Sequence, residues 1–351
     1  PITPASDILH TLSAWKHLGI KTFQAEDEIA GITSVLGAAF TGDLGITATS
    51  GPGIALKGEA MGLAVMAELP IVIINVQRGG PSTGLPTKTE QSDLMQAMYG
   101  RNGEAPVPIL ASATPGDCFF AAYEACRIAV KYMTPVVLLT DGYLANGSEP
   151  WQVPKVDDLP DFDVSFADES NLADGQFLSY SRDKKTLARP WAIPGTPGLE
   201  HRIGGIETED LTGNVSYDPD NHHYMVETRA KKVDAIANEI ASSEIFGSKS
   251  GDLLILSWGG TKGACRSATE ALKADGKKVG HLHLRWINPF PKDLGEKLIK
   301  FKNILIPEIN YGQLIKLIRA EFLVDAQGLN QVRGKPISSA DIQEASNKLI
   351  G

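Results

Sequence analysis

Short apolar runs alternate with amphipathic stretches over the first 150 residues of the chain. Runs rich in Val and Ile predict buried strands, and stretches with Ala, Leu, Met and Gly at helical spacing predict helices. The strands are expected at 71–76, 109–111 and 135–139, with strand ends at 21–24 and 46–49, and the helices at 29–40, 55–67 and 116–132. Such alternation is typical of a parallel sheet with helices on both faces.

The pattern changes between residues 151 and 245. Pro, Asp and Gly become dense up to about residue 225 and the apolar periodicity is lost; the stretch 190–198 alone holds three prolines. A single amphipathic helix is then expected at 227–242. We interpret 151–245 as a connector with a linking helix, which wraps the surface and has no core of its own.

The alternation of strands and helices returns after residue 251. Strands are expected at 253–257, 279–284 and 303–307, and helices at 263–273 and 312–322. The sequence therefore predicts an α/β protein in three parts: a parallel-sheet domain at 1–150, the connector at 151–245, and a second, smaller α/β domain at 246–351.

Charge and hydropathy exclude two classes of partner. The formal net charge is −9, and no basic stripe is present. Nucleic acid is therefore not expected as a partner, because binding a polyanion needs clustered Lys and Arg. The longest apolar run, 71–76, has the length of a strand, so no membrane-spanning segment is predicted.

The three cysteines are Cys118, Cys126 and Cys265, an odd number placed far apart. Their spacing is not that of metal ligands, so we expect small core residues in a reducing cytoplasm, with neither a metal nor an iron–sulfur cluster in this chain. The sequence opens on Pro1 without an initiator Met, and we expect it to be part of a longer polypeptide.

The first four residues read Pro-Ile-Thr-Pro. Thr3 followed by Pro4 predicts a helix that starts here, with Thr3 as its N-cap and Pro4 in the first helical position. A helix N-terminus can also hold an anion, with the Thr3 hydroxyl as a further donor. The two interpretations are compatible, and spacing alone favours the cap.

Three acids, Glu26, Asp27 and Glu28, stand between a predicted strand end and the helix at 29–40. The helix dipole favours acids at this position, which would explain them without any function. Glu28, however, directly precedes an apolar helix at the edge where ligands bind in parallel α/β sheets. A carboxyl desolvated at this edge could share a proton with a bound base.

A second strand-to-helix turn reads Thr-Ser-Gly-Pro-Gly at 49–53. Its glycines permit positive φ and would let backbone amides converge on a ligand. The turn is not a dinucleotide fingerprint, because Leu56 stands where a further glycine is required, and the chain has no Walker phosphate loop.

The richest polar stretch is the loop 78–90, which reads Arg-Gly-Gly-Pro-Ser-Thr-Gly-Leu-Pro-Thr-Lys-Thr-Glu directly after a predicted buried strand. Loops that follow strands on a rigid scaffold often carry function. Arg78, as a bidentate fork, and Lys88, as a point charge, could hold two carboxylates. A solvated surface loop is the alternative interpretation.

Together these segments resemble the pyrimidine-binding domain of thiamine-diphosphate enzymes. In that superfamily a Glu at a strand end is followed by a Gly inside the helix and then by a Thr-Ser-Gly-Pro-Gly turn. Here Glu28 is followed by Gly37 and by the turn at 49–53, and this spacing selects Glu28 over Glu26.

In finer detail the chain resembles, over essentially its whole length, the α subunits of 2-oxoacid:ferredoxin oxidoreductases. The resemblance is carried by Pro-Ile-Thr-Pro at 1–4, Gln-Ala-Glu-Asp-Glu-Ile-Ala at 24–30, Arg-Gly-Gly-Pro-Ser-Thr-Gly at 78–84, Thr-Lys-Thr-Glu-Gln at 87–91, Asp-Gly at 141–142, Arg-Pro-Trp at 189–191, Gly-Asn at 213–214 and Glu-Ile-Asn-Tyr-Gly-Gln at 308–313. The loop at 78–93 is most similar to the 2-oxoglutarate branch.

The resemblance implies an enzyme that is active only with a partner. This chain would supply the pyrimidine half of the thiamine diphosphate site, followed by a domain like the C-terminal domain of transketolase. A β subunit would supply the diphosphate half, Mg²⁺ and a [4Fe-4S] cluster, in a heterodimer or an (αβ)₂ assembly. In keeping with this, Gly42-Asp43-Leu44 breaks the Gly-Asp-Gly pattern of the Mg²⁺–diphosphate site.

The implied reaction is CoA-dependent oxidative decarboxylation of a 2-oxoacid, or the reverse reductive carboxylation, with ferredoxin as electron carrier. Glu28 would be the catalytic residue at the pyrimidine, and Ser50, Gly51 and Gly53 would contact the cofactor. On the substrate side, Thr3 and Arg78 would hold the α-carboxylate, and Lys88 with Thr87 would reach the distal carboxylate of 2-oxoglutarate.

Two other functions remain open. One is a β-type subunit of a thiamine-diphosphate E1 dehydrogenase, which passes the acyl group to lipoate and has no iron–sulfur partner. The other is a scaffold subunit that keeps the fold without catalysis, and against it stand the intact Glu28 and the intact loop 78–90.

Overall fold

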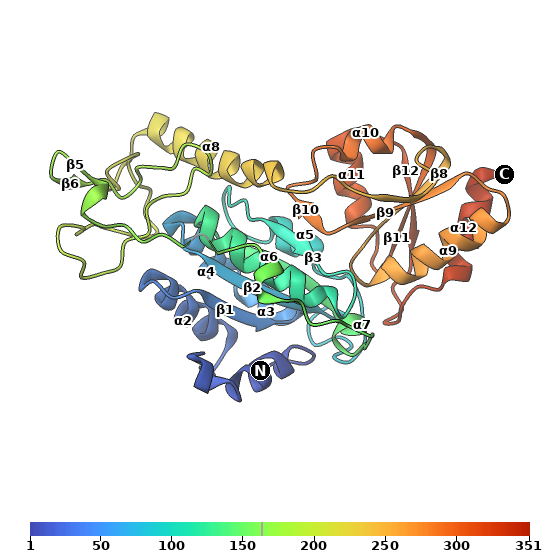
Figure 1. Cartoon of the computed structure of the whole chain (residues 1–351), viewed down its shortest axis with the longest axis horizontal. Coiled ribbons are helices and arrows are strands. Elements are labelled where there is room, and N and C mark those ends of the chain that lie inside the picture. Colours follow the sequence, from blue (N-terminus) through green and yellow to red (C-terminus); the bar gives the residue numbers. More distant parts are fainter. Residues whose placement is uncertain (163) are drawn as a thin grey trace.

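The computed structural model describes residues 1–162 and 164–351 and contains two α/β domains that lie side by side (Figure 1). The first sheet has the order β1-β2-β4-β3-β10. Its strands are β1 (Gly45–Thr49), β2 (Ile71–Gln77), β3 (Ile109–Ala111), β4 (Val136–Asp141) and β10 (Trp286–Asn288). All pair in parallel except β10, which runs antiparallel to β3 although it comes from far later in the sequence.

Both faces of this sheet are buried. Alternate residues of a strand point to opposite faces, so each strand contributes apolar side chains to both. Along β4, Val137 and Leu139 join one apolar cluster, while Val136 and Leu138 join another against α6. The covering helices are α2 (Glu28–Phe40), α3 (Gly51–Leu56), α4 (Gly58–Ala67) and α6 (Asp117–Tyr132), with the short α5 (Leu94–Tyr99) and α7 (Gly142–Ala145) at the strand ends. The predicted α/β class is confirmed, as are the strands expected at 46–49, 71–76, 109–111 and 135–139 and the helices expected at 29–40 and 116–132, whereas the single helix expected at 55–67 is divided into α3 and α4.

The strand end predicted at 21–24 is wrong. None of the described sheets includes these residues, and Phe23 is 69% exposed. A stretch of four mostly exposed residues gains too little buried apolar area to hold an extended pairing.

The helix start predicted at Thr3 is also wrong. The helix α1 (Ser6–Ser13) has Ala5 as its N-cap, without a side-chain cap. The amide of Ala5 donates to the carbonyl of Ile2 at 2.7 Å, so residues 2–5 form a turn ahead of the helix. A 3₁₀ helix at Lys16–Leu18 then leads away from α1.

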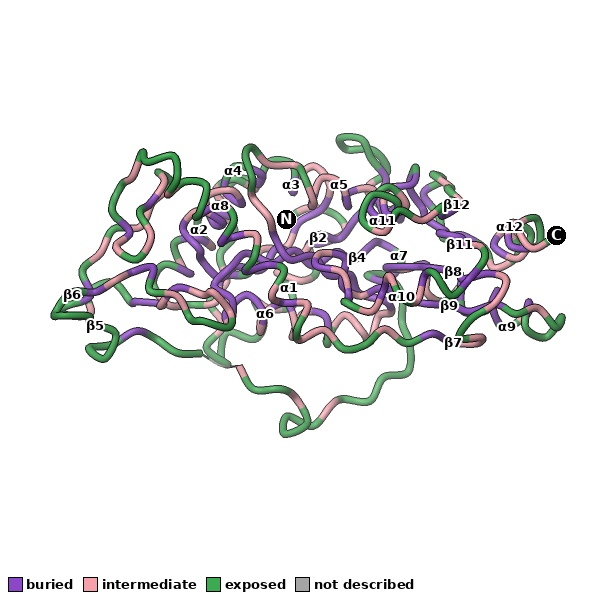
Figure 2. Tube along the Cα trace, turned by 90° about the horizontal axis from the view of Figure 1, so that it is seen from above, coloured by how far each residue is buried: buried purple, intermediate pink, exposed green. Residues whose placement is uncertain are grey.

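The second sheet has the order β12-β11-β8-β9-β7. It consists of β7 (Ile245–Gly247), β8 (Gly251–Trp258), β9 (Val279–Leu284), β11 (Phe301–Glu308) and β12 (Ala326–Asn330), of which only β7 pairs in the antiparallel sense. The helices α9 (Lys262–Ala274), α10 (Leu294–Leu298), α11 (Leu314–Phe322) and α12 (Ser339–Ile350) pack around it. Figure 2 shows the buried strands as the middle layer of both domains.

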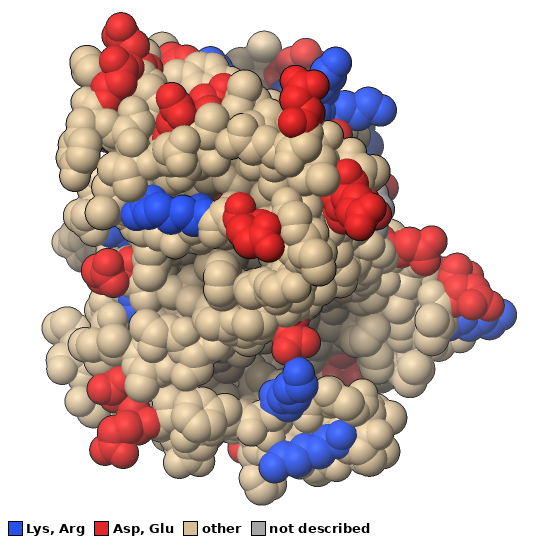
Figure 3. Space-filling model, turned by 90° about the vertical axis from the view of Figure 1, so that its left-hand side faces the viewer, with Lys and Arg blue, Asp and Glu red and all other residues tan. Residues whose placement is uncertain are grey.

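The connector between the domains has little regular structure until α8 (Pro219–Ala235), which ends in a 3₁₀ turn at Ile236–Asn238. Before α8 its described residues form two 3₁₀ turns, at Val156–Asp158 and Glu169–Asn171, and the small hairpin of β5 (Leu172–Ala173) and β6 (Gln176–Phe177). Acidic and basic side chains are interspersed over this end of the molecule (Figure 3).

The helix α8 begins at Pro219, earlier than the position predicted from apolar periodicity. Asp218 caps it by accepting from the amide of Asn221 at 2.7 Å, and Pro219 occupies the first helical turn. Such a start is set by the cap and the proline rather than by an apolar face. The predicted division at residues 150 and 245 stays a prediction.

The connector is fastened to the first domain by side chains that reach backbone carbonyls. Trp191 Nε1 donates to the carbonyl of Ala39 at 2.9 Å, and Arg189 Nε donates to that of Ala67 at 3.0 Å. The Ala67 carbonyl is one of those that the end of a helix leaves without a partner, whereas the Ala39 carbonyl also accepts from the amide of Gly42 at 3.3 Å. None of the helices in the described part of the chain is long and apolar enough to cross a membrane.

The two domains are joined by a buried hydrogen-bond network centred on Gln91. Its side chain donates to the carbonyl of Trp258 at 2.7 Å and accepts from the amide of Ile309 at 3.0 Å. Its backbone amide donates to the carbonyl of Ile309, and its carbonyl accepts from Asn310 Nδ2 at 2.9 Å. Every polar group of Gln91 is therefore used across the domain interface.

A second contact of this kind is made by Asp141, at the end of β4. Its buried carboxyl accepts from the Thr89 hydroxyl at 2.9 Å and from the amide of Gly260 in the second domain at 3.0 Å. Burial raises the pKa of Asp141, and these hydrogen bonds oppose the shift. The segment from Thr89 to Gln91 is thus held from both domains.

We predict that Gln91→Ala destabilises the protein by about 1–3 kcal/mol, because the buried amide of Ile309 loses its acceptor. Gln152→Ala, which truncates an exposed glutamine in the connector, should change stability by less than about 0.5 kcal/mol. Urea unfolding followed by fluorescence measures both. Equal unfolding midpoints for the two variants would contradict the role given to Gln91.

Candidate active site at the carboxyl edge of the first sheet

Glu28 is the first residue of α2 and is half-buried. Asp27 precedes it as the N-cap, and its carboxylate accepts from the amide of Ala30 at 2.7 Å. The capping role therefore belongs to Asp27, which leaves the Glu28 carboxyl available for another contact. This separates two neighbouring acids that look alike in the sequence.

The turn after β1 brings Glu28 to the edge of the sheet. A β-carbon at position 53 would lie 2.0 Å from Thr49 Oγ1 and 2.8 Å from Glu28 Cγ, so only glycine fits between them. Gly51 and Gly53 do not have positive φ, contrary to expectation, and start α3 instead. The glycine is needed here for the close approach of α2, not for a left-handed backbone.

Ser50 is completely buried and its hydroxyl has no hydrogen-bond partner among the described residues. It is the N-cap of α3 but makes no side-chain cap. A buried hydroxyl without a partner is unfavourable, which suggests that a ligand completes its hydrogen bonding.

A lysine that the sequence analysis did not select lies beneath Glu28. Lys57, at the junction of α3 and α4, is 2% exposed, and its Nζ donates to the carbonyl of Glu28 at 2.8 Å. Burial lowers the pKa of Lys57 to about 8, although the charges of Glu28 and Asp27 attract its proton. Lys57 thus fixes the start of α2 from inside the domain.

Further polar groups gather where β2 ends. Asn75 lies in register with Thr49, and its Nδ2 donates to Asp93 Oδ2 at 2.9 Å. The hydroxyl of Ser92 donates to Asp93 Oδ1 at 2.9 Å. Burial raises the pKa of Asp93, and the Asn75 Oδ1 atom has no partner among the described residues.

Arg78 and Thr3 lie together, as the sequence analysis expected for a carboxylate site. Arg78 is 5% exposed, and its Nη1 donates to the carbonyl of Thr3 at 2.6 Å. Its Nε is buried without a partner among the described residues. Burial raises the pKa of Asp93, and the positive charge of Arg78 opposes this shift.

The loop 78–90 closes on itself next to Arg78. The amide of Gly79 donates to the carbonyl of Lys88 at 3.0 Å, and that of Leu85 donates to the carbonyl of Gly79 at 2.8 Å. Thr87 and Lys88 are exposed on it. The structure therefore brings Lys88 to the residue beside Arg78 but does not bury it.

The base of this loop touches the second domain. The Glu90 carboxyl accepts from the amides of Gly80 and Gly334, and burial raises its pKa. A β-carbon at Gly334 would lie 2.9 Å from the β-carbon of Lys88. The loop is therefore held between the domains instead of lying free on the surface.

These residues fit a polar ring bound at the edge of β1 and β2. The unpartnered buried atoms are a hydroxyl on Ser50, an amide oxygen on Asn75 and a guanidinium nitrogen on Arg78. They offer both a donor and an acceptor, next to a carboxyl on Glu28. An aminopyrimidine presents the matching donors and acceptors.

Of the residues that the sequence analysis missed, Asn75 had a signal, since it interrupts an otherwise apolar strand. Asp93 could have been found only through its contact with Asn75. Lys57 gave none, because a lysine in a helix is usually solvated and its burial depends on how α2 and α4 pack.

Comparison with known families agrees with this geometry. Residues 1–217 match the family described as pyruvate flavodoxin/ferredoxin oxidoreductase, thiamine diphosphate-binding, and residues 251–342 match pyruvate:ferredoxin oxidoreductase core domain II. The chain is 54% identical to 2-oxoglutarate oxidoreductase subunit KorA of Mycobacterium tuberculosis, over 95% of this chain and 50% of that protein. It is 33% identical to 2-oxoglutarate synthase subunit KorA of Archaeoglobus fulgidus, over 90% of this chain and 83% of that protein.

A solved structure shares the fold. It is that of 2-oxoglutarate:ferredoxin oxidoreductase from Magnetococcus marinus with 2-oxoglutarate, coenzyme A and succinyl-CoA bound, and it matches with a TM-score of 0.93 and 35% identity. The match covers 100% of this chain and 61% of the other. The chain thus spans about half of the Mycobacterium relative and less than two thirds of the solved one.

We predict that the protein gains stability as pH rises from about 8 to 10.5, because Lys57 releases its proton in the folded state before it does so in the unfolded chain. Lys57→Met should reduce this gain. It should not abolish it, since burial lowers the pKa of Lys232 to about 8 as well.

Urea unfolding at pH 7.5 and at pH 9.5 tests this prediction. Lys21→Met removes a lysine whose side chain is 84% exposed and should keep the native pH dependence. An unchanged pH dependence in Lys57→Met would show that Lys57 is not buried as described.

Proposed function

The chain belongs to the pyruvate flavodoxin/ferredoxin oxidoreductase family of thiamine diphosphate-binding proteins, and on this basis we propose that it is the α subunit of a 2-oxoglutarate:ferredoxin oxidoreductase. The proposed reaction is CoA-dependent oxidative decarboxylation of 2-oxoglutarate, or its reverse, with ferredoxin as electron carrier. The relatives that support the choice of substrate are named for 2-oxoglutarate, and the solved relative has 2-oxoglutarate and succinyl-CoA bound.

The observation that carries the proposal is the contact between Glu28 and Gly53, beside the unpartnered hydroxyl of Ser50. Glu28 thus lies close to the turn where β1 ends, and the buried hydroxyl of Ser50 has no hydrogen-bond partner in the described part of the chain. A scaffold subunit without catalysis would be expected to fill such a place with apolar side chains.

Glu28 would hydrogen-bond a ring nitrogen of the cofactor's pyrimidine and hold a proton there. Gly51 and Gly53 would let the ring approach the backbone, and Ser50 would donate to it or accept from it. Lys57 would keep Glu28 in place from below. When bound, thiamine diphosphate supplies the nucleophilic carbon and the electron sink for decarboxylation.

Arg78 and Thr3 would bind the α-carboxylate of the substrate. The Arg78 guanidinium already uses Nη1 on the Thr3 carbonyl and keeps Nε free for a further acceptor. Lys88, with Thr87, would approach the distal carboxylate, because the loop brings Lys88 next to Gly79. Arg78 and Lys88 would thus each bind one of the two carboxylates of a dicarboxylate substrate.

The proposal includes a partner. The relatives named above are subunits. A β subunit would supply the diphosphate half of the cofactor site, Mg²⁺ and a [4Fe-4S] cluster, and CoA and ferredoxin would bind to the assembled heteromer.

The decisive experiment is reduction of a viologen dye by the full-length subunit assembled with its native partner. 2-Oxoglutarate and pyruvate should each be tested with and without CoA. Reduction that needs CoA and prefers 2-oxoglutarate would support the proposal. Activity with pyruvate alone would overturn the substrate, and no activity in a complex shown to hold cofactor and cluster would overturn the enzymatic role.

We predict that Glu28→Gln lowers turnover by about 100-fold or more, because acid–base groups typically contribute 10²–10⁴-fold. Glu26→Gln is the matched control, since it removes the same charge from an exposed residue close by. Its turnover should stay near that of the native enzyme. Similar turnover in the two variants would remove Glu28 from the active site.

Substitutions of the two basic residues of the loop should differ in their effects on the two substrates. Arg78→Lys loses the guanidinium fork and should lower kcat/KM about 10- to 100-fold for both 2-oxoacids. Lys88→Met should lower it for 2-oxoglutarate only. Equal effects of Lys88→Met on both substrates would contradict a contact with the distal carboxylate.

A further inference from the structure

A cluster of buried charge lies at the amino-terminal edge of the first sheet, opposite the candidate active site. Glu68, just before β2, is 1% exposed and accepts from Arg182 Nη2 at 2.5 Å and Nη1 at 2.7 Å. It also accepts from Lys232 Nζ, which in addition donates to the carbonyl of Met133 at 2.9 Å. Burial alone would raise the pKa of Glu68, but the charges of Lys232 and Arg182 outweigh it and lower the pKa to about 2.

A third cation lies within reach of this cluster without a carboxylate of its own. Arg189 is 3% exposed, and its guanidinium donates only to the backbone carbonyls of Ala67 and Pro190. Among the described residues, no carboxylate forms an ion pair with it. Burial lowers the pKa of Arg189; Tyr180 and the carboxylate of Glu68 oppose this shift, and the charge of Arg182 adds to it.

The buried charges are therefore out of balance. Arg182 and Lys232 share the carboxylate of Glu68, and Arg189 lies within the influence of this carboxylate without an ion pair among the described residues. Asp210 adds only the weakest of the attractions that act on Arg182. Buried charges are normally paired, since an isolated ion loses its hydration without compensation. A surplus of positive charge in this place calls for an anion.

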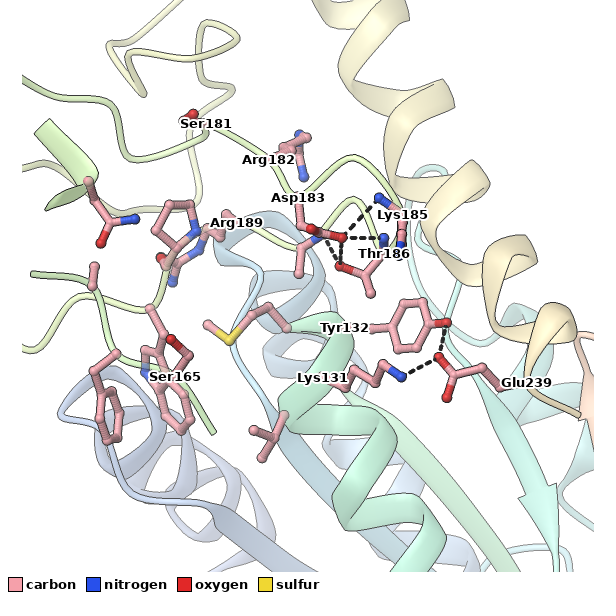
Figure 4. A pocket seen from close by; sticks show the side chains of 18 of the residues that line it. Lys131, Tyr132, Ser165, Ser181, Arg182, Asp183, Lys185, Thr186, Arg189 and Glu239 are labelled. Atoms are coloured by element: carbon pink, nitrogen blue, oxygen red, sulfur yellow. Dashed lines mark hydrogen bonds and ion pairs between the residues drawn. The ribbon is translucent and has the colours of Figure 1, made fainter. Parts of the chain in front are cut away.

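A cavity of about 970 Å³ opens on this cluster. The end of α6, the connector segments around Phe166 and Trp191, and Glu239 line it, and both Arg182 and Arg189 reach its wall (Figure 4). The Nε atom of Arg182 is buried there without a hydrogen-bond partner among the described residues. A volume of this size is within the range of small-molecule sites.

The acids on the wall of the cavity do not correct the imbalance. Asp183 accepts from the backbone of Lys185 and from the amide and hydroxyl of Thr186. Glu239 accepts from Arg127, Lys131 and Tyr132 (Figure 4). Glu239 is thus already paired with other cations, and among the described residues neither carboxylate forms an ion pair with Arg182 or Arg189.

We propose that this cavity is a binding site for a small molecule that carries an oxyanion, phosphate or carboxylate, with Arg189 and Arg182 as its principal contacts. Lys185, an exposed lysine on the rim, adds a further positive charge. The rings of Phe166 and Trp191, 5.0 Å apart, offer an apolar wall for the rest of the ligand. The site lies at the end of β4 away from Asp141, so a ligand there would not displace one at Glu28.

The proposal does not depend on the catalytic reaction, so binding is measured directly. Inorganic phosphate and citrate are titrated into the full chain by calorimetry, at constant ionic strength set with sodium chloride. Saturable binding of either anion at one site is expected, and the anion that binds tells whether the site takes phosphate or carboxylate. Absence of saturable binding by both would overturn the proposal.

Three variants test whether the anion binds in the cavity. Arg189→Met and Lys185→Met should each weaken it by about tenfold or more, as expected for a lost charge-assisted hydrogen bond. Lys302→Met, which removes an exposed lysine of the second domain, should leave it unchanged. Binding that Arg189→Met and Lys185→Met do not alter would belong elsewhere and would overturn the proposal. If Arg189→Met fails to fold, Lys185→Met alone decides, because this side chain is on the surface.

Discussion

The hydrogen bonds of Gln91 are the constraint on which the candidate site depends. The segment from Arg78 to Asp93 carries two of the site's charged groups, and its far end is held by carbonyl and amide groups of the second domain. Backbone groups buried in an interface must find partners, so the segment has little freedom to move. The second domain therefore positions this segment. The motif at 308–313, which supported the family resemblance, takes part in this interface.

The sequence was sufficient for most of the fold and for the place of the site. Buried parallel strands are recognisable as short runs of Val and Ile, and their carboxyl ends meet at one edge, so Glu28, the turn at 49–53 and Arg78 could be brought together in advance. Elements set by a cap or by a distant partner were missed or misplaced. The strand β10 has three residues and exists only because β3 offers it an edge, and α8 starts at a cap. The burial of Lys57 and the excess of positive charge around Glu68 follow from packing, which no local sequence pattern encodes.

The polar groups at the two edges of the first sheet lack different things: hydrogen-bond partners at one edge and balancing charge at the other. At the carboxyl edge, neutral and charged groups of Ser50, Asn75 and Arg78 lack hydrogen-bond partners. At the amino edge most donors are satisfied, but the charges do not cancel. Both conditions cost free energy, and local inconsistencies of this kind concentrate where a protein binds something. The unpartnered polar groups at one edge match the polar ring proposed there, and the excess positive charge at the other edge matches the proposed anion.

The pairing of β10 with β3 has a consequence for how the chain folds during synthesis. The edge of the first sheet stays open until residues 286–288 have left the ribosome, since these residues close it. The usual order, in which an N-terminal domain completes itself before the next one appears, is therefore not available to this protein. Until then β3 pairs only with β4, and its other edge is open to wrong pairing with other chains. A nascent chain halted within the connector would be expected to require a chaperone, whereas one released after β10 would not.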